Sequence, residues 1–402
     1  MDVFGLEHIV RALEGAWSLL KYKKSTMTET QSRKTNNQIS RTTLKVTTAA
    51  ATISTLTMSP PSKHLAAIIP QKGGPLAVEE RTTPTCGPKQ LLIEVHAIAF
   101  NPIDYYQRDM GFFIEEYPAV VGCDIAGVVA QTGSDMSPRA PTTGTRVTAL
   151  ASSFYHKGNP DYGAMQKYVL VGEDTVAVLP DEFSFVEGCV FPLAALTAWN
   201  GWLWAGIARV PIDRSEKKGV LVWGASSSMG ALAVQGAKNM GYTVYATASP
   251  QHHEYLKTLG AARVFDYKSD DVSSDILDAA KEDGIAIRVA YHAIGAQQVS
   301  ADIISKSAGS DQGKLAIAPI VDQNLKVPEN VESAFVQAPE GPEAREERLR
   351  WIFGTWLQEG LAAKQLVASP KIKVIEGGLE SANKALDELK AGVSCTKLVI
   401  EI

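Results

Sequence analysis

The chain has 402 residues, of which 45% are hydrophobic, and its formal net charge is −5. This length exceeds what one hydrophobic core usually supports, so two folded domains are expected. The weak negative charge provides no long-range attraction to nucleic acid or to an anionic membrane, and neither is expected as a partner. The four cysteines are scattered, as is typical of reduced intracellular thiols rather than of a disulfide framework or a zinc knuckle; they are Cys86, Cys123, Cys189 and Cys395.

The first 59 residues differ in composition from the rest. Residues 1–24 have an amphipathic helical pattern, and residues 31–59 are rich in Thr, Ser and Asn, with four basic residues and no acidic one. Such a segment cannot build a core, so residues 1–59 are predicted to be a disordered leader. It partly resembles a mitochondrial transit segment, but it contains acidic residues. An extension that is cleaved or never translated, with Met58 as the start, is the other interpretation. We expect a cytoplasmic location, with mitochondria as the alternative.

From residue 64 onward the chain is rich in predicted strands. Apolar, β-branched runs bounded by Gly and Pro predict strands at 65–69, 91–99, 127–131, 146–150 and 168–171. Few helical periods precede Glu187. The longest nearly uncharged run, 191–208, is interrupted by Pro, Asn and Gly and is followed by Arg209. A buried helix between two domains explains this run better than a membrane span does.

A nucleotide-binding motif comes next. The apolar run 220–223 leads into a turn of small residues and then into an apolar helical segment, 231–240. The turn consists of Gly224, Ala225, Ser226, Ser227, Ser228, Met229 and Gly230. Only the last glycine of the G-x-G-x-x-G fingerprint is present, but small side chains still let a phosphate approach the N–H groups of a helix start. An ordinary strand–turn–helix corner without a ligand is the alternative.

Strands and helices then alternate. Strands are predicted at 243–248, 263–266, 288–292 and 314–320, and helices at 253–259, 274–282 and 296–305. This order predicts an α/β domain with a doubly wound parallel sheet covered on both faces. Two more helices, 343–361 and 379–389, and a strand, 397–402, end the chain.

The second strand of this domain favours NADPH over NADH. An NAD site usually carries an acidic residue here, on the ribose hydroxyls, but the segment 246–249 has none. Ser249 can donate a hydrogen bond to a 2′-phosphate, His252 or His253 can add a donor or a charge, and Tyr267 follows the third strand. The alternatives are that the histidines belong to a solvated helix start and that Tyr267 is a loop aromatic that caps the core. Two further cofactor contacts are predicted after the strand 288–292, at Ile294 and Gly295.

Motifs along residues 64–402 resemble those of the medium-chain dehydrogenase/reductases, in their zinc-free quinone-reductase and enoyl-reductase branch. In chain order they are Asn101-Pro102-Ile103-Asp104, Gly122–Val129, Gly163-Ala164 with Tyr168, Leu196-Thr197-Ala198, Leu259-Gly260-Ala261, Asp266-Tyr267, Gly378-Leu379-Glu380 and Lys397-Leu398-Val399. The Ser-rich loop looks most like that of fungal trans-acting enoyl reductases.

The resemblance implies a GroES-like substrate domain, built from residues 60–193 plus 323–402, around a Rossmann NADP-binding domain at 194–322. The active site lies in the cleft between them, and the chain is a monomer or a homodimer. Where zinc-dependent members carry ligands, the segment 101–104 offers no Cys and Cys123 replaces the usual His. No metal site is therefore expected, and simple alcohol oxidation is disfavoured.

With alcohol oxidation disfavoured, the reaction that remains is hydride transfer to an already activated double bond. Asn101 and Tyr106 occupy pocket positions in zinc-free relatives and are expected to donate to the developing enolate oxygen. Tyr106, or a water molecule, is expected to protonate the α-carbon. Thr197 is expected to bind the cofactor near the nicotinamide. The alternatives are that Asn101 only shapes a turn, that Tyr106 is a core aromatic and that Thr197 only caps a helix start.

Three functions fit these expectations. The first is an NADPH-dependent reductase of small enones or quinones. The second is a trans-acting enoyl reductase that serves a polyketide synthase, with a carrier protein as partner. The third is a non-enzymatic NADPH-binding protein.

Overall fold

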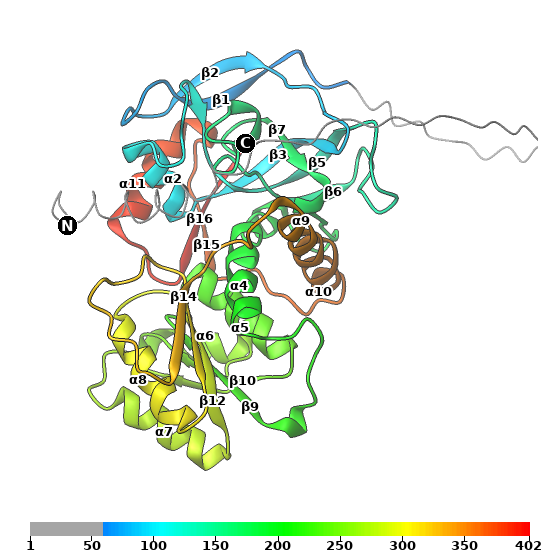
Figure 1. The fold of residues 1–402 in the computed structure, drawn as a ribbon. Helices are drawn as coiled ribbons and strands as arrows, with labels where there is room; N and C mark the ends of the chain where they lie inside the picture. Colours follow the sequence, from blue (N-terminus) through cyan, green and yellow to red (C-terminus); the bar gives the residue numbers. More distant parts are fainter. Residues whose placement is uncertain (1–58) are drawn as a thin grey trace, which may run out of the picture. The chain divides into compact units, whose positions relative to one another are not determined.

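A computed structural model describes residues 59–402. The predictions for the leader, including the Met58 start, lie outside the described residues. The described part contains a three-stranded sheet of order β2-β1-β4 and a six-stranded sheet of order β11-β10-β9-β12-β13-β14. A seven-stranded sheet has the order β15-β16-β3-β5-β6-β8, with β7 paired to β3 (Figure 1).

Both ends of the described chain build the two mostly antiparallel sheets. The last strand, β16, pairs antiparallel with β3, with Val399 opposite Ala99. The strands are β1 (Lys63–Ile69), β2 (Ala77–Thr82), β3 (Gln90–Ala99), β4 (Ala119–Val120), β5 (Asp124–Thr132), β6 (Arg146–Leu150), β7 (Tyr168–Gly172), β8 (Val176–Val178), β15 (Lys371–Val374) and β16 (Thr396–Glu401). Helices α2 (Pro102–Met110), α3 (Phe185–Gly188) and α11 (Ala382–Ala391) accompany them. This is the GroES-like lobe that the sequence predicts.

The six-stranded sheet is parallel throughout. Its strands are β9 (Lys218–Trp223), β10 (Thr243–Thr247), β11 (Arg263–Phe265), β12 (Ala286–His292), β13 (Gly313–Ile317) and β14 (Val331–Phe335). The helices between them are α5 (Ser228–Asn239), α6 (His253–Leu259), α7 (Val272–Asp283) and α8 (Gln297–Ala308). The strand order reverses beside β9, which creates the topological switch point where such sheets bind ligands. The predicted doubly wound fold is confirmed.

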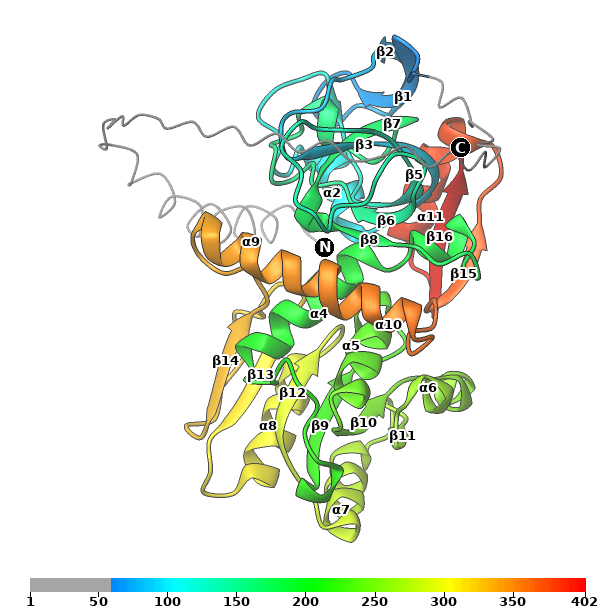
Figure 2. The ribbon, with the colours of Figure 1, turned by 90° about the vertical axis from the view of Figure 1, so that its right-hand side faces the viewer.

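The apolar run 191–208 forms α4 (Pro192–Trp204), which packs between the two lobes against α5 (Figure 2). Trp199 and Trp202 are fully buried, so these aromatics belong to the core. The polar helix after β14 comprises α9 (Pro342–Trp351), a π-helical turn over Ile352–Leu357 and α10 (Gln358–Ala362). Among the described residues, no helix is long and apolar enough to span a membrane.

Several elements differ from the sequence-based expectation. Helix α2 forms directly after Asn101, in a region where few helical periods are visible. Strand 314–320 ends at Ile317. Strand β14 pairs with β13 and extends the nucleotide-binding sheet beyond residue 322, the expected boundary of that domain. Contacts between elements accompany these differences: α2 packs against α11, and β14 pairs with β13.

Candidate active site

The turn between β9 and α5 is shaped to receive a phosphate group. Gly224 has a left-handed φ of +77°, and its backbone N–H donates to the Thr247 hydroxyl at 3.0 Å. A Cβ atom on Gly230 would lie 2.5 Å from the Gly224 oxygen, so only glycine fits where the helix meets the turn. Ser227 caps α5 by accepting from the Gly230 N–H at 3.1 Å. The Ser228 hydroxyl is buried and has no protein partner in the described residues, which suits a ligand oxygen at this helix start.

The other loop residues support this turn. Ala225 is fully buried, and its N–H donates to the Thr247 carbonyl at 2.9 Å. Met229 packs against the main hydrophobic core, and Ser226 is partly exposed at the mouth of the turn. These residues hold the loop at the start of α5, where free N–H groups and the positive end of the helix dipole favour an anion.

The adenosine end of the candidate site lies at the neighbouring ends of β10 and β11. Ser249 follows β10, and its side chain makes no capping hydrogen bond. Tyr267 follows β11 and is 42% exposed, with the Lys268 ammonium 5.7 Å from its ring centre. Lys268 was not among the candidates predicted from sequence, although a cation directly after Tyr267 was a usable signal for a 2′-phosphate site.

The two histidines do not point at this site as free donors. His252 is buried, and its Nε2 lies 2.9 Å from the Ser394 hydroxyl. The pKa of His252 is lowered, first by burial and then by Lys371, so a charge there is disfavoured. His253 donates through Nε2 to the Ala248 carbonyl at 3.0 Å. The Nε2 atoms of both rings therefore already have protein partners, His252 toward the segment before β16 and His253 in the turn after β10.

The loop after β12 lies beside the turn at Gly224. His292 Nε2 donates to the Gly295 carbonyl at 3.1 Å, and its Nδ1 accepts from the Ser300 hydroxyl at 2.8 Å. Burial lowers the pKa of His292 to about 4, so the ring stays neutral and holds this loop at physiological pH. Ile294 is 60% exposed and lies over Gly224, where an added Cβ would meet its side chain at 2.4 Å.

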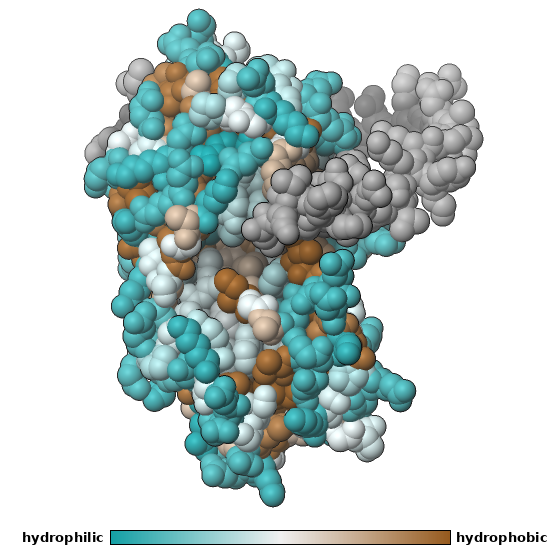
Figure 3. All heavy atoms as spheres, turned by 90° about the vertical axis from the view of Figure 1, so that its left-hand side faces the viewer, coloured by the Kyte–Doolittle hydropathy of each residue, from teal (hydrophilic) through white to brown (hydrophobic). Residues whose placement is uncertain are grey.

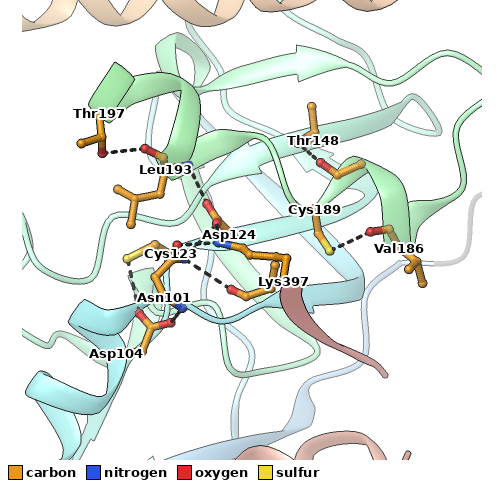
Figure 4. Close-up of polar contacts among 12 residues, drawn as sticks. Asn101, Asp104, Cys123, Asp124, Thr148, Val186, Cys189, Leu193, Thr197 and Lys397 are labelled. Atoms are coloured by element: carbon orange, nitrogen blue, oxygen red, sulfur yellow. Dashed lines mark hydrogen bonds and ion pairs between the residues drawn. The ribbon is translucent and has the colours of Figure 1, made fainter. Parts of the chain in front are cut away.

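A buried polar network lies on the substrate side, at the start of α4 (Figure 4). Asp124 accepts from the Leu193 N–H at 2.6 Å, from the Asn101 amide at 2.8 Å and from the Lys397 ammonium at 3.0 Å. Lys397 also donates to the Asn101 oxygen at 2.5 Å. Lys397 and Asp124 are 3% and 0% exposed. The network therefore joins β5, β16, the start of α2 and the start of α4.

Asp104 and Cys123 complete this network. The Asp104 carboxylate accepts from the Asn101 N–H at 2.8 Å, and the Cys123 thiol donates to it at 3.7 Å. Burial raises the pKa of Asp104 to about 7, against the opposing effect of the Asn101 N–H. The pKa of the Cys123 thiol is also raised, first by burial and then by Asp104, so this thiol is not a nucleophile at neutral pH.

The two catalytic candidates, Asn101 and Tyr106, differ in what their side chains contact. Both Asn101 amide hydrogens already face protein acceptors, the Asp124 carboxylate and the Ala99 carbonyl at 3.5 Å, which leaves no amide donor for a substrate. Tyr106 is only half-buried and stacks edge-on against Tyr105, with ring centres 4.5 Å apart. The Tyr105 and Tyr106 hydroxyls share a side-chain hydrogen bond, which adds to the effect of burial in raising the pKa of Tyr105. Thr197 donates to the Leu193 carbonyl at 2.7 Å, and its hydroxyl oxygen can still accept a hydrogen bond.

Comparison with known proteins identifies the family. The model of the alcohol dehydrogenase GroES-like domain matches residues 87–181, and that of the zinc-binding dehydrogenases matches residues 228–330. The trans-enoyl reductase tndF of Aspergillus flavipes is 46% identical over 346 residues, covering 85% of this chain and 99% of that protein. The trans-enoyl reductase tazE of Aspergillus terreus is 50% identical over 281 residues, covering 68% and 92%. The chain belongs to the medium-chain dehydrogenase/reductase family.

Solved structures of this family agree with the fold. The quinone oxidoreductase of Coxiella burnetii aligns with a TM-score of 0.61 and 26% identity over 85% of this chain and 99% of that chain. The CurK enoyl reductase aligns with a TM-score of 0.64 at 18% identity, which supports the fold alone. As a medium-chain dehydrogenase/reductase of the enoyl- and quinone-reductase branch, the chain is an oxidoreductase with a nicotinamide nucleotide-binding fold.

The second matching family model is named for zinc-binding dehydrogenases. The side chains of this chain, however, do not provide a set of zinc ligands. At the positions where zinc-dependent medium-chain dehydrogenase/reductases are expected to carry ligands, this chain has Asn101 and Cys123, and the Lys397 ammonium contacts Asn101 directly. An ammonium group at 3.0 Å from Asp124 repels a second cation, and zinc requires three or four N, S or O donors. Within residues 59–402, no three His, Cys, Asp or Glu side chains group as metal ligands.

Proposed function

We propose that this chain is an NADPH-dependent enoyl reductase that acts in trans on an unsaturated thioester carried by a separate polyketide synthase. The relatives that are 46% and 50% identical are both named trans-enoyl reductases, and this observation carries the proposal. It favours the second of the three functions expected from sequence over the reduction of small enones or quinones. The cytoplasmic location and the monomeric or homodimeric state stay predictions.

The preference for NADPH rests on the ends of β10 and β11. A carboxylate would repel a 2′-phosphate, and no acidic residue follows β10 before Pro250. Ser249 has an unengaged hydroxyl, and Lys268 lies beside the exposed Tyr267 ring. We propose that Ser249, Tyr267 and Lys268 bind the 2′-phosphate, whereas His252 and His253 support the turn. Ile294, Gly295 and Thr197 are proposed to contact the nicotinamide end.

The residues of this chain then position the substrate and supply a proton. NADPH, when bound, would supply the hydride for the β-carbon of the enoyl group, and negative charge would then develop on the carbonyl oxygen. We propose that the Tyr106 hydroxyl gives its proton to the α-carbon and regains one from solvent, since a phenol holds its proton at neutral pH. Asn101 is proposed to hold Asp124 and Lys397 in place, and with them the start of α4.

A small enone or quinone reductase is the second candidate. The Coxiella burnetii quinone oxidoreductase is 26% identical and aligns along 99% of its length, so the fold accommodates quinone chemistry. An NADPH-binding protein without turnover would share the nucleotide groove but would need no proton donor such as Tyr106.

Nucleotide oxidation against a panel of acceptors tests this proposal. The panel includes a but-2-enoyl group on a carrier protein, the same group on pantetheine, a small enone and a quinone. We expect the highest kcat/KM for the carrier-linked substrate and a preference for NADPH over NADH. Turnover confined to quinones, or tight NADPH binding without turnover of any acceptor, would contradict it.

A further inference from the structure

Arg345 is an unpaired cation in an unfavourable place. It lies in the first turn of α9, near the positive end of the helix dipole, where a basic side chain is destabilising. Other arginines nearby have hydrogen-bond or ion-pair partners: Arg209 pairs with Glu347, Arg350 pairs with Glu346, and Arg348 donates to the Asn200 side-chain oxygen at 3.3 Å. In the described part of the chain, Arg345 has no carboxylate partner, and its Nε is buried without any hydrogen-bond acceptor. Such local conflicts are expected at functional sites.

One aromatic ring fixes the position of this guanidinium. Its Cζ lies 5.0 Å from the centre of the Tyr155 ring, a cation–π arrangement. Burial raises the pKa of Tyr155, against the opposing effect of Arg345. The Tyr155 hydroxyl makes no hydrogen bond to the described residues, so the pair presents two polar groups without an internal acceptor.

The loop that carries Tyr155 places this pair beside the buried network. The loop begins directly after β6, and the Ala151 N–H donates to the Cys123 carbonyl at 2.7 Å. Phe154 packs against the core cluster that contains Cys123 and the start of α4. Burial raises the pKa of Tyr155, and Cys123 adds to this effect. The tyrosine therefore belongs to the same lobe as the network, next to a position that carries a metal ligand in zinc-dependent relatives.

Arg345 comes from the segment that follows the nucleotide-binding sheet, and Tyr155 comes from the GroES-like lobe. Helix α9 follows β14, the last strand of the nucleotide-binding sheet, so Arg345 and Tyr155 meet across the boundary between the two sheets. Figure 3 shows one face of the described residues, on which hydrophobic residues and residues of intermediate hydropathy are exposed between mostly hydrophilic upper and lower parts. A cation without a carboxylate partner at such a boundary is suited to an electron-rich oxygen of a ligand.

We propose that Arg345 binds the carbonyl oxygen of the substrate and stabilises the negative charge that develops there during hydride transfer. This inference rests on the proposed function and deepens it. As the hydride adds to the β-carbon, the carbonyl π electrons move to oxygen and the guanidinium donates hydrogen bonds to the resulting enolate. When the α-carbon is protonated, the C=O bond re-forms and the oxygen is released. Arg345 thus takes the electrophilic role of a metal, and the Tyr155 ring is a positioning residue.

Variants on one helix test this role. We expect Arg345→Ala to lower kcat with but-2-enoyl pantetheine by about 100-fold, as for loss of one oxyanion donor, and millimolar guanidinium to restore part of the rate. Arg345→Lys should retain more activity than Arg345→Ala. Arg350→Ala removes a cation from the same helix without touching Tyr155 and should leave kcat unchanged. Tyr155→Phe keeps the ring and should stay active, whereas Tyr155→Ala should lose activity.

A binding measurement separates this inference from the proposed function. Calorimetry with saturated butanoyl pantetheine and NADP⁺ requires no turnover, and we expect Arg345→Ala to weaken thioester binding about 10-fold or more. If the unchanged chain reduces no enoyl thioester but still binds the butanoyl probe through Arg345, the proposed function fails and the carbonyl site stands. If Arg345→Ala retains both kcat and affinity, or the unchanged chain does not bind the probe, the inference is overturned.

Discussion

Replacing Lys397 with methionine should destabilise the chain strongly, because it leaves Asp124 as a buried charge. Lys397 and Asp124 are 3% and 0% exposed, and their charged atoms lie 3.0 Å apart. Asp124 would keep only the Leu193 and Asn101 donors. The pKa of Asp104, which Lys397 lowers, would rise further, so Asp104 would become protonated at neutral pH.

The size of the effect follows from burial. Removing one partner of a buried ion pair costs about 3–5 kcal/mol, whereas an exposed pair contributes about 0–1 kcal/mol. The surface pair of Lys373 and Glu388, 2.7 Å apart on the neighbouring strand and α11, is therefore a matched control. Asp124→Asn should also be costly, since it leaves the Lys397 ammonium unpaired. The double variant should lose less than the sum of the two singles, with a coupling energy of about 2 kcal/mol.

Urea unfolding, followed by fluorescence, measures these free energies on the full chain. We expect Lys397→Met to lower the free energy of unfolding by about 3–5 kcal/mol and Lys373→Met by less than about 1 kcal/mol. Equal losses for both lysines, or strictly additive losses for Lys397→Met and Asp124→Asn, would refute the account of a coupled buried pair.

Four further changes test separate parts of the site. Gly230→Val should abolish nucleotide binding in a fluorescence titration, because its Cβ would lie 2.5 Å from a backbone oxygen, whereas Gly236→Ala on the same helix makes only ordinary contacts and should bind normally. Ser249→Asp should reduce the preference for NADPH over NADH at least about ten-fold in Kd, by placing a carboxylate near the 2′-phosphate. Tyr106→Phe should lower kcat about 100-fold with little change in nucleotide Kd; an unchanged rate would remove Tyr106 as the proton donor. The pKa of Asp104 is raised to about 7, so its contribution to stability is complete below its unfolded pKa and is lost as pH rises toward about 7. Urea unfolding at about pH 5 and about pH 8 should show this loss in the unchanged chain and not in Asp104→Asn.

Much of the fold follows from local patterns in the sequence. Alternating apolar strands and helices predict the parallel sheet, and the small-residue turn before α5 predicts the phosphate loop, because both depend on spacing within a few residues. Helix α2 had a similar signal that was overlooked. Asn101 at the cap, Pro102 at the first position and Asp104 at the third form a capping box, which is typical of a helix start.

The remaining features depend on contacts between distant segments. A lysine in a terminal strand is usually solvated, and nothing near Lys397 indicates that it meets Asp124, 273 residues away in sequence. His252 follows the expected phosphate-binding strand, but Ser394 engages its ring. Arg345 is singled out by its contact with Tyr155 and by its buried Nε without an acceptor, and both depend on tertiary packing. Tertiary packing decides these environments, so the sequence could name candidate residues but not their roles.

Transfer of deuterium from NADPH labelled at the reactive C4 position tests the central claim most directly. With but-2-enoyl thioester as acceptor, mass spectrometry and NMR should find deuterium at the β-carbon of the saturated product and a solvent-derived proton at the α-carbon. A product without deuterium at the β-carbon, or labelled nucleotide that stays unoxidised in the presence of the thioester, would contradict the assignment of this chain as an enoyl reductase.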